Sequence, residues 1–158
     1  MAIAEVREYL KQWGLDKQIL EFNVSSATVE LAAQALNCAP QRIAKTLSFK
    51  LGERYLLIVV AGDAKIDNAK YKKHFGTKAK MLTPAEAEEY IGHAVGGVWR
   101  FGVKPGVEVY LDCSLKRFDT VFPACGSSNS AIELSPDDLA HYANSLGWLD
   151  VCKNWQEI

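Results

Sequence analysis

The feature that most constrains the fold of this chain is an uninterrupted apolar stretch, Tyr55–Ala61, which follows the pair Gly52-Glu53. Because polar and apolar residues do not alternate in it, the stretch predicts a β-strand that is buried on both faces. The β-rich segment Lys45–Leu51 comes directly before the pair, so we predict a hairpin with its turn at Gly52. The stretch is far too short to cross a bilayer. We therefore expect a soluble protein built around this hairpin.

Further helices and strands are predicted on both sides of the hairpin. Apolar periodicity, capping residues and terminal glycines indicate helices at 3–13, 28–36, 67–75, 84–92 and 135–146. Short strands are expected at 19–22, 80–82, 107–111, 120–122 and 131–134. Ser25 or Ser26 is the expected cap of the second helix, and Thr83 with Glu86 forms a capping box for the fourth. The tail, 148–158, is expected to pack back on the domain.

The order of these elements favours an α+β protein. Helices and strands interleave without a regular βαβ alternation, which is typical of a mixed sheet with helices packed outside it. We predict a mixed, partly barrel-like β-sheet surrounded by helices, in a single domain that spans residues 1–158, since this length builds one core and not two. The start of the chain lacks the basic-then-apolar layout of a secretory signal, so we expect a cytoplasmic location.

The residues that most often bind metals and cofactors are widely scattered. The four cysteines include no Cys-x-x-Cys pair, and the three histidines form no pair with zinc-ligand spacing. The chain also lacks the glycine spacings of a dinucleotide fold or a P-loop. We expect free structural thiols, no metal and no cofactor.

Charge is distributed unevenly along the chain. Residues 42–80 hold ten basic and three acidic side chains, whereas residues 81–158 hold five basic and eleven acidic ones. Such asymmetry indicates either a surface for a polyanion or a solvated helix face that is rich in lysine. The basic segment lies between segments that could carry catalytic residues, and this position favours a surface that binds a polyanion.

Lys45 is the first candidate for chemistry, because it opens a strand among apolar neighbours. Burying an ammonium costs free energy unless it finds a partner. The lysine could hold a phosphate or polarise an ester carbonyl, or its stem could simply lie along the sheet edge with its charge in water. The residues alone favour the second interpretation.

Two loops complete the candidate regions. The segment 92–102 is rich in glycine, and its free N–H groups could stabilise an oxyanion, although a helix C-cap followed by a loop would look the same. The segment 125–130 is small and polar and could bind a substrate or merely form a turn. No serine lies in a Gly-x-Ser-x-Gly setting, so a covalent serine mechanism is not indicated.

Taken together and in order, several strings resemble the YbaK/prolyl-tRNA-synthetase-associated domain family. They are Ile43-Ala44-Lys45-Thr46-Leu47, the run from Val59 to Asp67, Val95-Gly96-Gly97-Val98, Tyr110-Leu111-Asp112, and Gly126 with the run from Ala131 to Leu139. They span roughly residues 20–145, and their common register makes the match specific although each string is short. The resemblance implies a barrel-like mixed sheet with outer helices, in agreement with the pattern above.

The resemblance also implies a set of site residues. Lys45 is expected to contact the terminal phosphate or the ester, while the backbone of Gly96 and Gly97 positions the aminoacyl carbonyl or an attacking water. The residues expected to bind the substrate are Thr46, Gly62, Asp63, Trp99, Arg100, Gly126, Ser128 and Asn129. The basic segment, and not the resemblance, predicts the residues that bind tRNA, which are Lys65, Lys70, Lys72 and Lys73.

The function implied is trans-editing, the metal-independent hydrolysis of the ester between a tRNA and a wrong amino acid. A pocket discriminates poorly between small side chains, so a second hydrolytic site supplies the missing fidelity. The expected substrate is tRNA-Pro carrying a small residue such as Ala or Cys, and the expected partners are aminoacyl-tRNA and an aminoacyl-tRNA synthetase. Arg100 stands where the family loop commonly has proline, which leaves the amino acid removed open. The alternatives are a non-catalytic tRNA- or synthetase-binding module and a hydrolase of small non-RNA esters.

Overall fold

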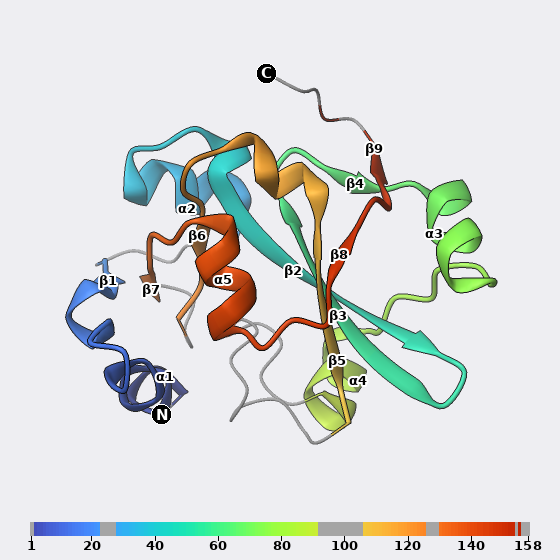
Figure 1. Ribbon diagram of the computed structural model, residues 1–158, viewed down its shortest axis with the longest axis horizontal. Coiled ribbons are helices and arrows are strands. Elements are labelled where there is room, and N and C mark those ends of the chain that lie inside the picture. Colours follow the sequence, from blue (N-terminus) through green and yellow to red (C-terminus); the bar gives the residue numbers. More distant parts are fainter. Residues whose placement is uncertain (1, 23–27, 92–105, 126–129, 154, 156–158) are drawn as a thin grey trace.

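A computed structural model describes residues 2–22, 28–91, 106–125, 130–153 and 155 (Figure 1). Its α-helices are α1 (Ala2–Lys11), α2 (Val29–Leu36), α3 (Asn68–Phe75), α4 (Pro84–Tyr90) and α5 (Pro136–Tyr142). Short 3-10 helices are η1 (Asp16–Gln18), η2 (Pro40–Arg42) and η5 (Cys113–Arg117). The strands are β1 (Leu20–Glu21), β2 (Ile43–Leu51), β3 (Arg54–Ala61), β4 (Lys65–Ile66), β5 (Glu108–Asp112), β6 (Phe122–Pro123), β7 (Ser130–Ala131), β8 (Trp148–Leu149) and β9 (Cys152–Lys153).

The main sheet has the strand order β6-β2-β3-β5-β8. The predicted hairpin is confirmed, because β2 and β3 pair antiparallel from Ala44 opposite Ala61 to Leu51 opposite Arg54. The remaining neighbours in this sheet pair in parallel, which makes it mixed as predicted. Two-stranded ladders, β1–β7 and β4–β9, lie beside it. Isolated bridges between 121–124 and 131–134 continue the sheet from β6 towards β7.

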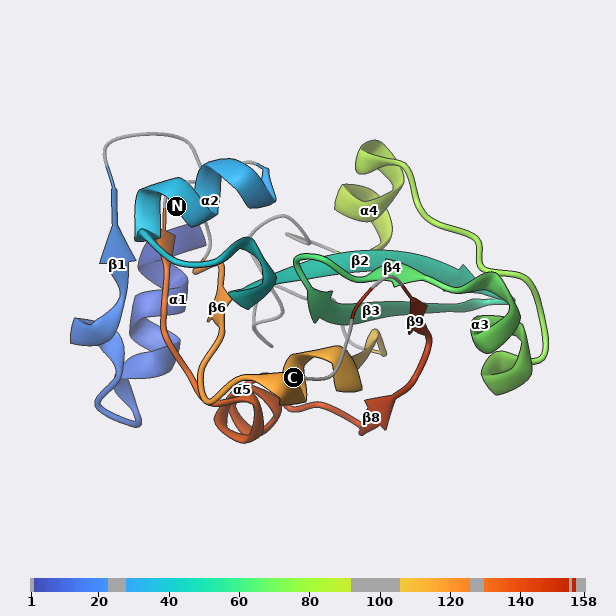
Figure 2. The same cartoon turned by 90° about the horizontal axis from the view of Figure 1, so that it is seen from above.

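The strand β3 forms the centre of the core, as its apolar run predicts. Residues 56–61 are fully buried. Figure 2 shows α4 on one side of the β2–β3 hairpin and α5 on the other, and residues of both helices belong to the main core cluster. The α3 helix adds Tyr71, whose ring lies 5.3 Å from that of Phe49 in β2. A seven-residue run can be continuously apolar only because both of its faces are covered.

Most predicted helix ends are confirmed, with two corrections. The capping box of Thr83 and Glu86 is present at the start of α4, and Gly76 ends α3 with a φ of 81°. The α2 helix is capped by Thr28 and not by the two predicted serines, which lie outside the described residues. The last helix ends at Tyr142, four residues early, because Asn144 adopts a left-handed φ of 56° that breaks the helical ladder.

The tail packs back on the domain, as predicted. Its strand β8 pairs in parallel with β5, and β9 pairs antiparallel with β4. Among the described residues, no helix combines the length and the apolar character needed to span a membrane.

Candidate functional site around Lys45

Lys45 lies near the start of β2 with its side chain partly buried. Its Nζ donates a hydrogen bond to the carbonyl oxygen of Gly62 at 3.3 Å. Gly62 follows the last residue of β3, and Ala44 opposite Ala61 fixes the two strand ends side by side. The hairpin register therefore brings the lysine to the turn that connects β3 to β4.

Gly62 occupies a position where only glycine fits. A Cβ atom added there would lie 2.1 Å from the carbonyl oxygen of Pro40 and 2.8 Å from Cγ1 of Val29. The first of these contacts is with backbone, which cannot move aside as a flexible side chain can. The absence of a side chain thus lets η2 and α2 pack directly on the turn that holds Lys45.

Asp63, the next residue, is held by Arg117 of η5. Both carboxylate oxygens accept from the guanidinium, at 2.5 and 3.0 Å. The side chain of Arg117 is only 6% exposed, which makes this the most buried ion pair between described residues. Bidentate pairs of this kind fix geometry as well as charge. Asp63 therefore supports the turn, and its carboxylate is already occupied in this structure.

The environment of Lys45 disfavours its charged form. Burial lowers the pKa of the ammonium below its ordinary value, while the nearby Asp63 carboxylate acts in the opposite direction. Burial also raises the pKa of Cys152, so this neighbouring thiol is neutral near pH 7 and adds no charge. Lys45 is thus a partly desolvated cation, and the Asp63 carboxylate near it is tied to another base, Arg117. Such a cation interacts strongly with a negative group that enters beside it.

Thr46, another predicted substrate residue that the structure describes, does not face the same side as Lys45. Lys45 and Thr46 are consecutive in β2, so their side chains lie on opposite faces of the sheet. A group that contacts the Lys45 ammonium would meet the main chain of Thr46 rather than its hydroxyl. The predicted residues Gly96, Gly97, Trp99, Arg100, Gly126, Ser128 and Asn129 lie outside the described residues.

The predicted tRNA-binding lysines have different surroundings. Lys65 in β4 and the α3 residues Lys72 and Lys73 are exposed. Lys70 instead donates from Nζ to Asp150 and to the carbonyl of Cys152, each at 3.0 Å. It is therefore bound to the tail, whereas the other three point to solvent.

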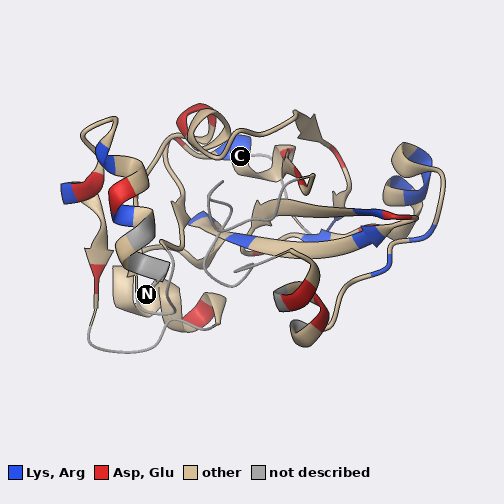
Figure 3. Cartoon of the chain, turned by 90° about the horizontal axis from the view of Figure 1, so that it is seen from below, with Lys and Arg blue, Asp and Glu red and all other residues tan. Residues whose placement is uncertain are grey.

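Sequence reasoning did not single out a basic hollow beside these lysines. It has a volume of about 470 Å³ and is lined by Lys50, Gly52, Thr77, Lys78, Ala79 and Lys80. The hairpin turn forms one wall, and the connector after α3 forms the other, because Lys50 N–H bonds to the Lys80 carbonyl at 2.9 Å. Figure 3 shows basic residues on α3, on this connector and at the hairpin end. Among the described residues, Lys50, Lys78 and Lys80 form no ion pair with an acidic side chain. The many lysines within residues 42–80 indicated a basic surface. The sequence did not show that the connector after α3 pairs with β2 and so brings these lysines together.

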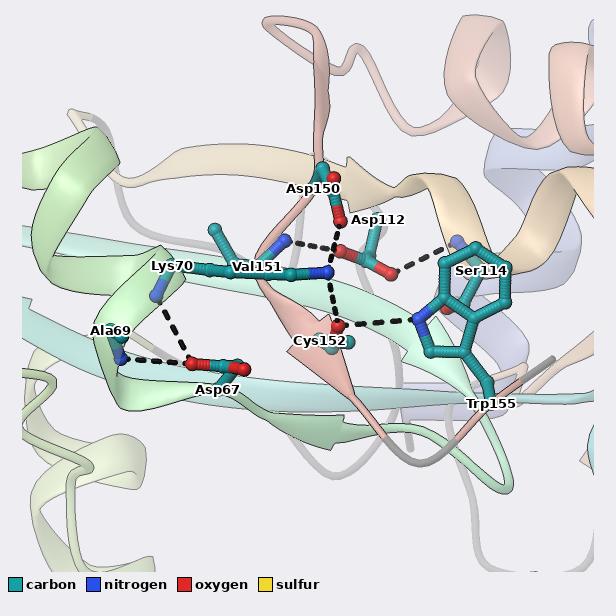
Figure 4. A network of polar contacts seen from close by, with 9 residues as sticks. All are labelled: Asp67, Ala69, Lys70, Asp112, Ser114, Asp150, Val151, Cys152 and Trp155. Carbon is teal, nitrogen blue, oxygen red and sulfur yellow. Dashed lines mark hydrogen bonds and ion pairs between the residues drawn. The ribbon is translucent and has the colours of Figure 1, made fainter.

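One group of possible metal ligands occurs in the described part of the chain, Asp112, Cys113 and Asp150. Its members already have partners. Both Asp112 oxygens accept backbone N–H groups, and Asp150 accepts from Lys70. Burial, followed by the two aspartates, raises the pKa of Cys113 to about 11, so its thiol is protonated at neutral pH. These contacts support a structural role for the group (Figure 4).

Comparison with known proteins agrees with this fold. A family described as the aminoacyl-tRNA editing domain matches residues 24–142. The chain is 54% identical over 157 residues to the uncharacterized protein YwhH of Bacillus subtilis (strain 168), covering 99% of this chain and 100% of that protein. It is 30% identical over 102 residues to a proline–tRNA ligase of Geobacillus sp. (strain WCH70), which corresponds to 64% of this chain and 18% of the ligase.

Solved structures show the same architecture. A protein described as a proposed trans-editing enzyme for prolyl tRNA synthetase superposes with a TM-score of 0.82 at 26% identity, covering 96% of this chain and 97% of the other. The hypothetical protein APE2540 superposes with a TM-score of 0.75 at 22% identity, covering 92% and 99% of the two chains, and supports the fold alone. The chain belongs to the aminoacyl-tRNA editing domain family.

Proposed function

We propose that this protein is a trans-editing deacylase that hydrolyses the ester of a mischarged aminoacyl-tRNA. The observation that carries the proposal is Lys45, a partly buried ammonium held by the Gly62 carbonyl within a chain of the editing family. A partly buried lysine lowers the stability of the folded protein, and residues whose pKa is shifted by burial cluster at functional sites. A cation placed there can bind a phosphate or an ester of the tRNA terminus.

In the proposed reaction, a water oxygen attacks the ester carbonyl carbon, and the bond to the ribose oxygen breaks. The proton lost by the water goes to that ribose oxygen, so the products are a free amino acid and an uncharged tRNA. The Lys45 ammonium orients the aminoacylated terminus and offsets the negative charge that develops during attack. Gly96 and Gly97 are proposed to position the carbonyl or the water through their backbone N–H groups.

The tRNA backbone is proposed to cross the basic surface of the protein. Exposed Lys65, Lys72 and Lys73 fit contacts with phosphates, and the basic hollow extends this surface to the far end of β2. Tyr55 lies opposite Lys50 in the hairpin register, so these two side chains share a face of the sheet, and the Tyr55 ring stacks on Tyr90 at 4.9 Å. Phosphate contacts of this kind position a nucleic acid without reading its sequence.

The substrate proposed is tRNA-Pro carrying a small wrong amino acid such as Ala or Cys, at a cytoplasmic site of action. Support comes from the similarity to a proline–tRNA ligase and to a structure described in terms of prolyl tRNA synthetase. A synthetase is accordingly the proposed protein partner. Trp99 and Arg100 are proposed to shape the pocket for the amino acid, together with Gly126, Ser128 and Asn129.

The test is deacylation of tRNA-Pro charged with Ala, Cys, Ser or Thr by wild type and by Lys45→Ala. We expect release of one of these amino acids by wild type and a loss in kcat of about a hundredfold or more in the variant, with thermal unfolding unchanged. Lys11→Ala, which removes an exposed lysine of α1, is the matched control and should keep full activity.

Two other outcomes would contradict the proposal. Binding of tRNA by wild type without release from any charged form would identify a non-catalytic binding module. Equal turnover by Lys45→Ala would remove this residue from the mechanism.

A further inference from the structure

The C-terminal segment, residues 148–153 and Trp155, lies beyond the residues that the editing family matches, 24–142, and its Cys152 is a neighbour of the Lys45 ammonium. Its strand β9 pairs with β4, placing Cys152 opposite Ile66. The Asp67 N–H bonds to the Val151 carbonyl at 2.8 Å, and Lys70 binds the Cys152 carbonyl. The segment is thus joined to the strand that follows the Gly62 turn.

The same segment is joined to η5. Asp112, which is fully buried, accepts from the N–H groups of Val151 and Ser114, both at 2.9 Å (Figure 4). The Trp155 indole N–H donates to the Cys152 carbonyl, and the ring lies 5.1 Å from the Arg117 guanidinium carbon. A buried carboxylate and a cation–π contact therefore hold η5 against the tail.

In turn, η5 holds the turn at Gly62 from the other side. Arg117 binds both oxygens of Asp63, and its Nε donates to the Ser114 carbonyl at 2.8 Å. The Ser114 hydroxyl accepts from the Ala61 N–H at 3.2 Å, just before Gly62. The turn is consequently fixed at its start by Ser114, at Asp63 by Arg117, and at β4 by the tail.

We propose that the C-terminal segment is a positioning element for the catalytic site, with Trp155 and Arg117 as positioning residues that act on Lys45 through the Asp63–Gly62 turn. This inference rests on the proposed deacylase function, because it assigns Lys45 the role given above. Neither side chain is placed in contact with the substrate. Each limits the freedom of the carbonyl that holds the Lys45 ammonium, and a small displacement of a catalytic group lowers turnover steeply.

The charge state of Lys45 depends on the same turn. The groups that act on its ammonium are Asp63 from the turn, Lys65 from β4, Glu30 from α2 and the neutral Cys152 thiol from β9. Asp63 favours the charged form, so releasing or neutralising its carboxylate should lower the pKa of Lys45 further. Activity that needs the ammonium would then be lost at a lower pH than in wild type.

The experiment compares Trp155→Ala, Trp155→Phe and the isosteric Asp63→Asn in the full chain. Each is assayed for kcat and KM on the charged tRNA across pH, with the rate of ester hydrolysis without enzyme subtracted. Independently of catalysis, the Lys45 side chain is titrated by NMR in lysine-labelled protein, with its signal assigned from Lys45→Arg. Lys11→Ala, at an exposed position of α1 outside the turn, η5 and the tail, is the control and should keep the wild-type kcat and Lys45 titration.

We expect Trp155→Ala and Asp63→Asn to lower kcat about tenfold or more with KM within twofold of wild type. The Lys45 titration should move to lower pH in Asp63→Asn, and Trp155→Phe, which keeps an aromatic face, should retain most activity. Unchanged kcat and an unchanged Lys45 titration in folded Asp63→Asn and Trp155→Ala would overturn the proposal. If wild type releases no amino acid, the deacylase proposal fails, while the NMR titration still decides whether the segment controls Lys45.

Discussion

At Lys45 and Gly62, two residues that are far apart in sequence perform one task. The lysine supplies a cation, and the glycine supplies the carbonyl that holds it at 3.3 Å. The carbonyl is in place because the chain at Gly62 packs against Pro40 with no room for a side chain. The position of the cation therefore depends on a glycine for its small size rather than for any unusual backbone angle.

Gly62→Ala is expected to destabilise the protein and to lower activity. The added methyl group would overlap the Pro40 carbonyl oxygen, and relief of such overpacking typically costs about 1–3 kcal/mol. Urea unfolding measures the loss of stability, and single-turnover deacylation measures the displacement of Lys45. Gly52→Ala is the control, because its Cβ would meet no atom within 4 Å and only its φ of 61° opposes the change. A Gly62→Ala protein that is as stable as wild type would show that η2 can move away without cost.

At the scale of elements, α3 and the connector that follows it carry the exposed basic charge. The α3 helix faces the core with Tyr71 and leaves Lys72 and Lys73 in solvent. The connector is tied to the outer edge of β2 by bonds from Lys50 N–H and Leu82 N–H. These bonds place the lysines of two separate segments around the basic hollow.

Replacing Lys78 and Lys80 by alanine is expected to raise KM for tRNA with little change in kcat. For each lysine that neutralises a phosphate, its removal should also reduce the slope of log affinity against log salt concentration by about 0.7–0.9. Titration of binding at several salt concentrations tests this, with Lys11→Ala/Lys17→Ala as a double control elsewhere on the surface. Lys70→Ala should instead loosen the tail, because this lysine is bound to Asp150 and Cys152. An unchanged salt slope in the Lys78/Lys80 variant would make the hollow a solvated surface only.

At the scale of the whole molecule, ion pairs between distant segments link stability to pH. A hydrogen bond from Arg54 holds the pKa of Glu108 below its ordinary value, and one from Thr120 does the same for Glu133. Each carboxylate therefore binds its proton less readily in the folded state than in the unfolded chain. Their contribution to stability is complete above the ordinary glutamate pKa of about 4.3 and is lost as the pH falls towards the folded values.

We accordingly expect the free energy of unfolding to decrease as the pH falls from about 5 to about 3. Urea unfolding across this range measures the slope, which should be smaller in Glu108→Gln/Glu133→Gln. Because these groups are partly exposed, added salt should weaken the effect. Glu53→Gln, in the exposed hairpin turn, is the control and should keep the wild-type slope. The double variant matching wild type at every pH would assign the acid sensitivity to other carboxylates.

The amino-acid sequence by itself determined those features that depend on neighbouring residues. The continuous apolar run predicted β3 as the buried central strand, and local capping signals predicted α3 and α4 nearly to their ends. The strings around Lys45 indicated the family, and the apolar neighbours of this candidate site residue indicated its partial burial. These inferences hold because periodicity, capping and desolvation are set within a few residues of the chain.

Only the tertiary structure decided which distant groups meet. Asp63 and Arg117 are 54 residues apart, and nothing in either segment indicates that they form a nearly buried pair. The contact between Trp155 and Arg117 likewise depends on long-range packing. So does the pairing of β2 with the connector after α3, which forms one wall of the basic hollow. Such contacts follow from how whole elements fill the space around a shared core, and that arrangement is a property of the folded chain rather than of any local pattern.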